Sequence, residues 1–155
     1  MAPATPLGKG GVSVVRVSGV GAKAVGEVVC GELNKPWVFK KCQIKNKKGV
    51  VVDSGLVVLF ESPKSYTGED VVEVHCHGSP VVVDLVVESF LGAGCRLAEP
   101  GEFTKRAYLN EKIDMTQAEA VSDLIASETE EAARAAHNSL VGEFSKLVNG
   151  VIDRV

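Results

Sequence analysis

The residues best suited to chemistry gather in two polar motifs of an otherwise Val-rich chain. The first is SYTGEDVVEVHCHGSP, residues 65–80, and the second is PGEFTKRAYLNEKIDMTQAEA, residues 100–120. A hydrophobic core needs neither so many charges nor so many turn residues. We therefore expect the two motifs to build a site.

Residues 71–77 have the composition of a β-strand, in which successive side chains point to opposite faces. One face is apolar. The other carries a carboxylate and two imidazoles, Glu73, His75 and His77, with about 7 Å between successive members. Three interpretations are open: a polar binding cleft, a hydrated sheet face with local hydrogen bonds, and a metal site. The metal site would need a third or fourth ligand that the sequence does not identify.

Two cations need separate consideration. Arg16 lies among valines in a predicted strand over residues 12–17. It is either an edge residue that reaches water or a donor held toward an anionic ligand, since its planar fork suits a carboxylate. Lys112, taken alone, has the features of an ordinary exposed lysine.

Alternating strands and helices must position these residues. Strands are expected at residues 12–17, 37–44, 50–60, 71–76 and 95–98, and helices at about 22–30, 80–91 and 103–109. Asn46–Gly49 suits a hairpin turn. Ser79 suits a helix N-cap and Pro80 the first helical position. This order of elements predicts an α+β domain.

The character of the chain changes near Asp114. Asp114 and Gln117 fit a capping box, and Ala, Glu and Leu dominate afterwards, which predicts one long helix or two stacked helices. An apolar stripe at helical spacing is still running where the sequence ends; its members are Leu140, Phe144, Leu147, Val151 and Val155. We therefore expect a chain truncated inside a helical domain.

Composition limits the function classes. With 155 residues, 45% hydrophobic and 24% charged, the chain is typical of a soluble protein of one domain or slightly more. The net charge of −3 does not indicate nucleic-acid binding, although five lysines crowd residues 40–48. Four separated cysteines, no signal peptide and no apolar span of about 20 residues predict a reduced cytoplasmic protein outside membranes. No G-x-x-x-x-G-K-[ST] motif occurs, which excludes a P-loop here.

Three motifs together resemble the MnmE (TrmE) family of tRNA modification GTPases. They are ATPLGKGGVSVVRVSG at residues 4–19, TGEDVVEVHCHG at residues 67–78, and the PGEFTKRA…QAEA string at residues 100–120. The resemblance covers essentially the whole chain. It implies a folate-binding and dimerisation domain at residues 1–112 and the incomplete first part of a helical domain at residues 113–155. It also implies a mixed sheet with packed helices, similar to the tetrahydrofolate-binding aminomethyltransferase-type domain.

The resemblance implies a function as well. A tetrahydrofolate derivative (5-formyl- or methylene-tetrahydrofolate) would bind to Arg16, Glu73 and Lys112. Catalytic residues and metal ligands are not expected in this chain, and GTP, Mg and K would belong to an absent GTPase domain. The expected partners are a second copy, a flavoprotein of MnmG type and the tRNA whose wobble uridine is modified. The alternative is a stand-alone folate-dependent one-carbon transferase, or a small metal hydrolase using His75 and His77.

Overall fold

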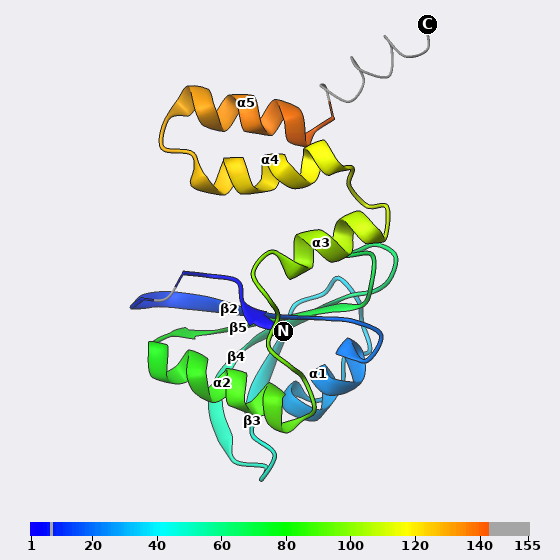
Figure 1. Ribbon diagram of the computed structural model, residues 1–155. Coiled ribbons are helices and arrows are strands. Elements are labelled where there is room, and N and C mark those ends of the chain that lie inside the picture. The colour runs from blue at the N-terminus through cyan, green and yellow to red at the C-terminus, as the bar shows by residue number, and fades with distance from the viewer. Residues whose placement is uncertain (7, 143–155) are drawn as a thin grey trace, which may run out of the picture. The chain divides into compact units, whose positions relative to one another are not determined.

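The computed structural model describes residues 1–6 and 8–142 (Figure 1). The chain divides into two compact units, Met1–Pro100 and the part from Gly101 onward, and each is described here by itself. The division by compactness follows Pro100, whereas the sequence predicted domains of 1–112 and 113–155. The predicted apolar stripe beyond Leu140 (Phe144, Leu147, Val151 and Val155) lies outside the described residues.

The first unit is a five-stranded sheet in the order β1-β2-β5-β4-β3. Its elements are β1 (Ala2–Pro3), β2 (Gly10–Ser18), α1 (Ala22–Cys30), β3 (Lys40–Lys45), β4 (Val51–Phe60), β5 (Val71–Gly78) and α2 (Pro80–Gly92). The predicted strands up to residue 76, both helices and the α+β class are therefore confirmed. The hairpin turn is confirmed too, since the Asn46 amide donates to the Val50 carbonyl and Gly49 donates to Asn46.

Every pairing in the described sheet is antiparallel, so the predicted mixed sheet is wrong. The loop at 61–70 returns the chain beside β4, and β5 then runs opposite to both β4 and β2. A parallel pair would need a helical crossover between neighbouring strands. Helix α1 instead connects β2 to β3, which lies at the far edge of the sheet.

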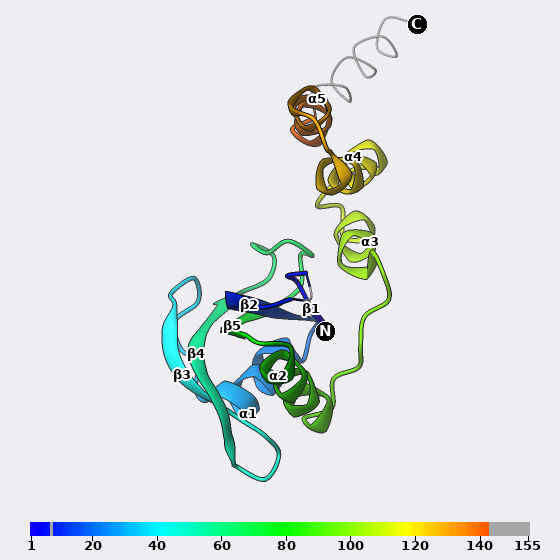
Figure 2. The same cartoon turned by 90° about the vertical axis from the view of Figure 1, so that its left-hand side faces the viewer.

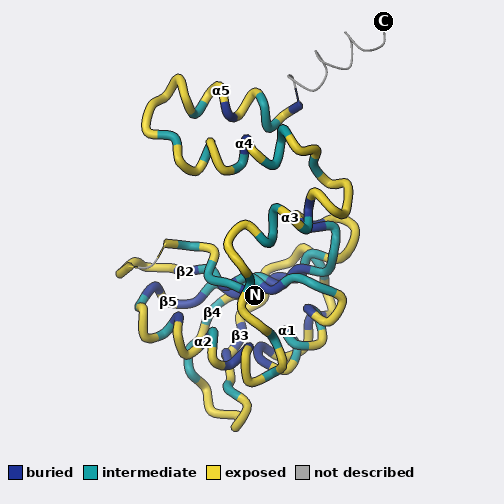
Figure 3. The backbone as a smooth tube through the Cα atoms, in the orientation of Figure 1, coloured by how far each residue is buried: buried dark blue, intermediate teal, exposed yellow. Residues whose placement is uncertain are grey.

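Helices α1 and α2 cover one face of this sheet (Figure 2). Alternate residues of the central strands are buried against them, including Val15, Val57 and Val74 (Figure 3). Phe90 of α2 is fully buried in the same cluster. Because this apolar layer occupies one face only, the side chains of the opposite face can be polar.

The predicted strand at 95–98 is absent, because residues 95–99 have no regular structure. The Met1 amine donates to the Arg96 carbonyl at 2.8 Å, and the Ala98 amide donates to the Met1 carbonyl at 2.8 Å. Met1 is thus the single residue of the described amino-terminal segment that pairs with residues 95–98. Ala2 and Pro3 pair with β2 instead, and Pro3 has no N–H to extend a second ladder.

The second unit contains α3 (Glu102–Leu109), α4 (Met115–Ala126) and α5 (Glu130–Leu140). Up to residue 142, two helices follow Asp114, which agrees with the second of the two predicted arrangements. The capping box is confirmed: Asp114 accepts from the Gln117 amide at 2.8 Å, and the Gln117 side chain accepts from the Asp114 amide. Within the described part of the chain, no helix has the length and apolarity needed to cross a membrane.

Candidate ligand-binding site

A row of polar side chains crosses the sheet face that α1 and α2 leave open. The alternation predicted for residues 71–77 is confirmed, since the valines and Cys76 are buried while Glu73, His75 and His77 are progressively more accessible. Arg16 of β2 lies directly opposite Glu73 of β5 in the strand register. The antiparallel pairing of β2 with β5 therefore joins two residues that are 57 positions apart.

Arg16 and Glu73 form an ion pair. The Arg16 Nε donates to Glu73 Oε1 at 2.7 Å, and Nη2 lies 2.7 Å from the same oxygen. The side chains are 29% and 15% exposed, so the pair is largely shielded from water. Arg16 thus donates to a carboxylate of this chain, whereas the two roles predicted for it were an edge residue that reaches water and a donor to an anionic ligand; the ligand role stays a prediction. Both contacts end on Oε1, which leaves Oε2 directed elsewhere.

His75 is the neighbour of that second oxygen. Its Nε2 lies 3.7 Å from Glu73 Oε2, beyond hydrogen-bonding distance. Nε2 is buried and has no hydrogen-bond partner among the described residues. The loss of a partner for a buried polar atom costs about 1–3 kcal/mol, so such atoms are rare in folded proteins. The unpaired Nε2 of His75 is therefore an exception in this sheet.

Aromatic residues border this polar row. The ring of Phe39 meets the His75 imidazole edge-on, with the centroids 5.1 Å apart. The Arg16 guanidinium lies 5.7 Å from the centre of the Tyr66 ring. Val58 of β4 is opposite Glu73 and is fully buried. Sequence reasoning did not select Phe39, which lies inside the predicted strand at 37–44, or Tyr66, which lies between the predicted strands at 50–60 and 71–76.

The loop at 61–70 is held by side chains of the first polar motif. Thr67 is completely buried, and its hydroxyl lies 2.6 Å from that of Ser18 on β2. Ser18 also donates to Glu69 at 2.8 Å, and Asp70 accepts from the Ser62 amide. These bonds fix the loop that carries Tyr66. The polar part of the motif before β5 therefore has a structural role.

His77 belongs to a separate pair with Asp53 of β4. Asp53 accepts from the His77 amide at 2.8 Å, and its other oxygen lies 2.7 Å from Nδ1 of the ring. Burial opposes ionisation of Asp53, but the hydrogen bonds from His77 and Ser54 outweigh it and lower the pKa of this carboxyl. Within the described residues, no cluster of three His, Cys, Asp or Glu could hold a metal ion.

Two cysteines that are distant in the sequence are neighbours in the core. Cys30 ends α1 and Cys42 lies in β3; both are buried, and both are free thiols. A hydrogen bond between the two thiols, together with burial, raises the pKa of Cys30, and the same bond lowers the pKa of Cys42. Because no C-x-x-C spacing marks the pair, sequence reasoning did not find it.

Lys112 follows α3 in the second unit. Its amide donates to the Ala107 carbonyl at 2.9 Å and closes the end of the helix, next to Glu111 with its φ of 55°. The Lys112 side chain is exposed. The structure brings Arg16 and Glu73 together within the first unit, whereas the grouping of Lys112 with them remains a prediction.

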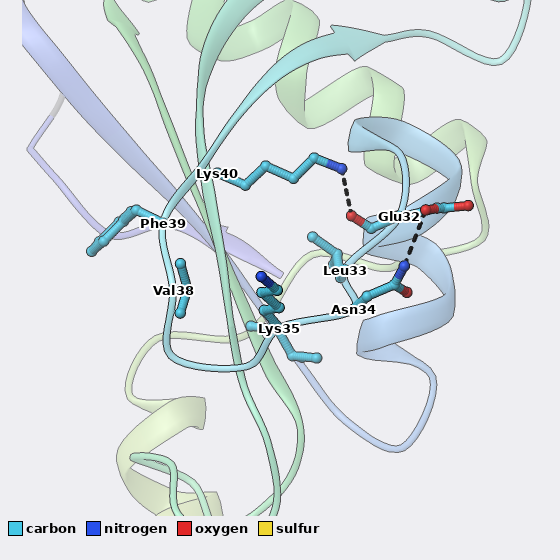
Figure 4. Close-up of a pocket in the computed structure, with 8 residues that line it drawn as sticks. Glu32, Leu33, Asn34, Lys35, Val38, Phe39 and Lys40 are labelled. Carbon is cyan, nitrogen blue, oxygen red and sulfur yellow. Dashed lines mark hydrogen bonds between the residues drawn. The ribbon is translucent and has the colours of Figure 1, made fainter.

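A pocket of about 310 Å³ opens beside the end of α1 and the start of β3 (Figure 4). The Lys40 ammonium donates to the Glu32 carbonyl at 2.9 Å across it, and Asn34 donates to the Glu32 carboxylate at 3.0 Å. In Figure 4 Phe39 points away from Lys40. Phe39 lines this pocket and also contacts His75, so the pocket adjoins the polar row.

The structure defines an α+β domain whose open sheet face carries an arginine–carboxylate pair beside an unpaired imidazole nitrogen. The family model described as the GTP-binding protein TrmE N-terminus matches residues 1–112, and the chain belongs to this family.

Curated relatives agree with the family assignment. The chain is 47% identical over 152 residues to the tRNA modification GTPase MnmE of Neisseria meningitidis serogroup C, and 49% identical to that of Coxiella burnetii. The protein of the same name from Francisella tularensis subsp. novicida is 44% identical over 155 residues. These matches cover 98–100% of this chain but only 33–34% of the relatives, so the chain spans about a third of their length.

Proposed function

We propose that this chain is the folate-binding and dimerisation module of a tRNA modification GTPase. In this proposal the chain binds a tetrahydrofolate derivative and forms a homodimer. The complete protein acts in the cytoplasm on the wobble uridine of tRNA, with a flavoprotein partner of MnmG type and with GTP, Mg and K bound to its GTPase domain. Support comes from the family and from the relatives named tRNA modification GTPase.

The single observation that carries the folate proposal is the pairing of Glu73 with Arg16 beside an unpaired buried imidazole nitrogen. A pterin ring presents adjacent N–H donors along one edge, and a carboxylate is their natural acceptor. Glu73 Oε2 is directed away from Arg16 and toward the unpaired nitrogen of His75. The donor set present therefore fits a reduced folate.

Each residue has a defined task in this proposal. Arg16 fixes the Glu73 carboxylate through Oε1 and keeps Oε2 available for a ligand. The aromatic ring of Tyr66 lies over the guanidinium and limits its access to water. Lys112 would pair with the anionic tail of the folate. When bound, the folate supplies a one-carbon unit for addition to uridine carbon 5.

Calorimetric titration of 5-formyltetrahydrofolate into the chain tests this proposal. We expect wild type to bind and Glu73→Gln to lose roughly 2–4 kcal/mol of binding free energy, because ligand donors lose their charged acceptor. Arg16→Ala should lose less, with a stronger effect at low salt. Asp53→Asn is a matched control, since Asp53 pairs with His77 and does not contact Glu73. Equal affinities of wild type and Glu73→Gln would contradict the proposal.

The alternative of a metal hydrolase using His75 and His77 loses support from the geometry. His77 pairs with Asp53, whereas His75 lies next to Glu73 and Phe39. The two imidazoles therefore have different surroundings and share no third ligand in the described part of the chain. A stand-alone folate-dependent transferase would use the same Arg16–Glu73 pair, and turnover of a one-carbon folate by the isolated chain would identify it.

A further inference from the structure

At the centre of the polar row, a carboxylate oxygen of Glu73 lies near a ring nitrogen of His75. Glu73 Oε1 is occupied by Arg16, while Oε2 faces the Nε2 of His75 at 3.7 Å. That nitrogen is buried and unpaired. The edge contact from Phe39 restricts rotation of the imidazole. A carboxylate oxygen and a ring nitrogen are therefore held side by side.

The carboxylate determines which tautomer of His75 suits this position. A neutral imidazole carries its proton on one ring nitrogen and a lone pair on the other. A lone pair on Nε2 would lie 3.7 Å from the negative Oε2 and be repelled by it, whereas an Nε2–H would place a positive hydrogen in the field of that oxygen. We assign the Nε2–H form on this electrostatic ground. The pair then offers one hydrogen-bond acceptor and one donor in adjacent positions.

This pattern is complementary to a lactam, in which an N–H donor lies next to a carbonyl acceptor. The C–N and C=O bond lengths place the lactam nitrogen and oxygen about 2.2 Å apart. Glu73 Oε2 and His75 Nε2 are 3.7 Å apart. Two hydrogen bonds of about 2.9 Å would span this difference if each leaned outward by about 15°, which keeps them nearly linear.

We propose that Glu73 and His75 together recognise the N–H/C=O lactam edge of a 4-oxo pterin, so that His75 is a specificity-determining residue of the site. This inference rests on the proposed folate function. A 4-amino pterin carries the opposite pattern on that edge, a ring lone pair next to an amino donor. It would set its lone pair against Oε2 and its N–H against the N–H of His75. The site therefore selects 4-oxo over 4-amino rings.

Paired ligands test this selection directly. Calorimetry compares 5-formyltetrahydrofolate with its 4-amino-4-deoxy analogue, which differs only at the proposed edge. Wild type should prefer the 4-oxo ligand by at least tenfold (about 1.4 kcal/mol), since the 4-amino ligand loses two hydrogen bonds and sets mismatched buried groups against each other. His75→Phe preserves the ring and its contact with Phe39 but has no nitrogen, and it should lose most of this preference. His77→Ala, on the same strand and face, should keep it.

A second measurement needs no variant. Histidine ¹⁵N spectra of wild type should report a protonated Nε2 at His75 whose signal shifts when 5-formyltetrahydrofolate binds. The inference is overturned if wild type binds both ligands equally, if His75→Phe keeps the full preference, or if Nε2 is unprotonated. Failure of wild type to bind 5-formyltetrahydrofolate at all would refute the proposed function itself. The two failures are thus distinguishable.

Discussion

Gly55 of β4 lies where the sheet has no room for a side chain. A Cβ built on Gly55 would be 2.1 Å from the His75 carbonyl oxygen and 3.1 Å from its carbon. Real Cβ atoms essentially never come closer than 3.0 Å to another heavy atom, so the two strands would have to separate by about 0.9 Å. The obstructing atom is backbone in a paired strand and cannot rotate away. Gly55→Ala should therefore destabilise the protein.

The size of this effect follows from two opposing contributions. Overpacking of a well-packed region costs about 1–3 kcal/mol, and a backbone obstruction belongs at the upper end of that range. Replacement of glycine by alanine recovers about 0.4–1 kcal/mol by restricting the unfolded chain. The net loss should be about 2 kcal/mol. For a unit of roughly 100 residues, this corresponds to a lowering of Tm by about 8–16 °C.

Urea unfolding followed by the fluorescence of Trp37, the single tryptophan, measures this loss. Trp37 packs edge-on against Phe60 at the end of β4, with the centroids 4.9 Å apart, and so reports on the same strand. Gly11→Ala is the matched control, because a Cβ at this glycine of β2 meets nothing within 4 Å. If the two variants unfold at the same urea concentration, the proposed close approach of β4 to β5 is refuted.

Three further predictions concern GTP binding, stability at low pH and the oligomeric state. The isolated chain should bind no GTP in saturable titrations, because it has no P-loop to hold the phosphates; reproducible binding would contradict this. The pKa of Asp53 is lowered in the folded state, so its pair with His77 stabilises the fold at pH values above the pKa of the unfolded carboxyl. This stabilisation is lost as the pH falls through the lower pKa of the folded state. The stability gap between wild type and Asp53→Asn should therefore narrow on acidification, and a gap unchanged down to pH 2 would argue against the pair. Light scattering should show a dimer for this chain and for a version ending at Lys112; a monomeric shorter version would place the contact in the later helices.

Local patterns allowed most of the elements to be predicted. The alternation around Glu73, the capping box at Asp114 and the turn at Asn46 each depend on a few neighbouring residues. Strand direction depends on which strands pair, which is why the antiparallel sheet was not predicted. The segment 95–98 was mistaken for a strand because its apolar residues give no sign that its backbone would bond to Met1 and Phe90 and not to a neighbouring strand.

The site was predictable in part. Strand alternation and an Arg among valines selected Glu73 and Arg16, and the family resemblance supplied their folate-binding roles. Neither signal indicated that the two side chains would pair, or that the Nε2 of His75 would be unpaired. The contact of Phe39 with His75 and the neighbouring thiols of Cys30 and Cys42 depend on tertiary packing. Alternation did place His75 on the same strand face as Glu73, two residues away, but as one of three open interpretations.

The strand order also has a consequence for the timing of folding. Strand β5 lies between β2 and β4, so the centre of the sheet cannot form until residues up to Gly78 are available. Contacts between residues this far apart require closure of a long loop and form slowly. Helices α4 and α5, by contrast, are joined by a short connection and can associate locally. During synthesis, the early strand β2 must therefore wait for β5 with one edge unpaired, and an unpaired strand edge is prone to aggregation.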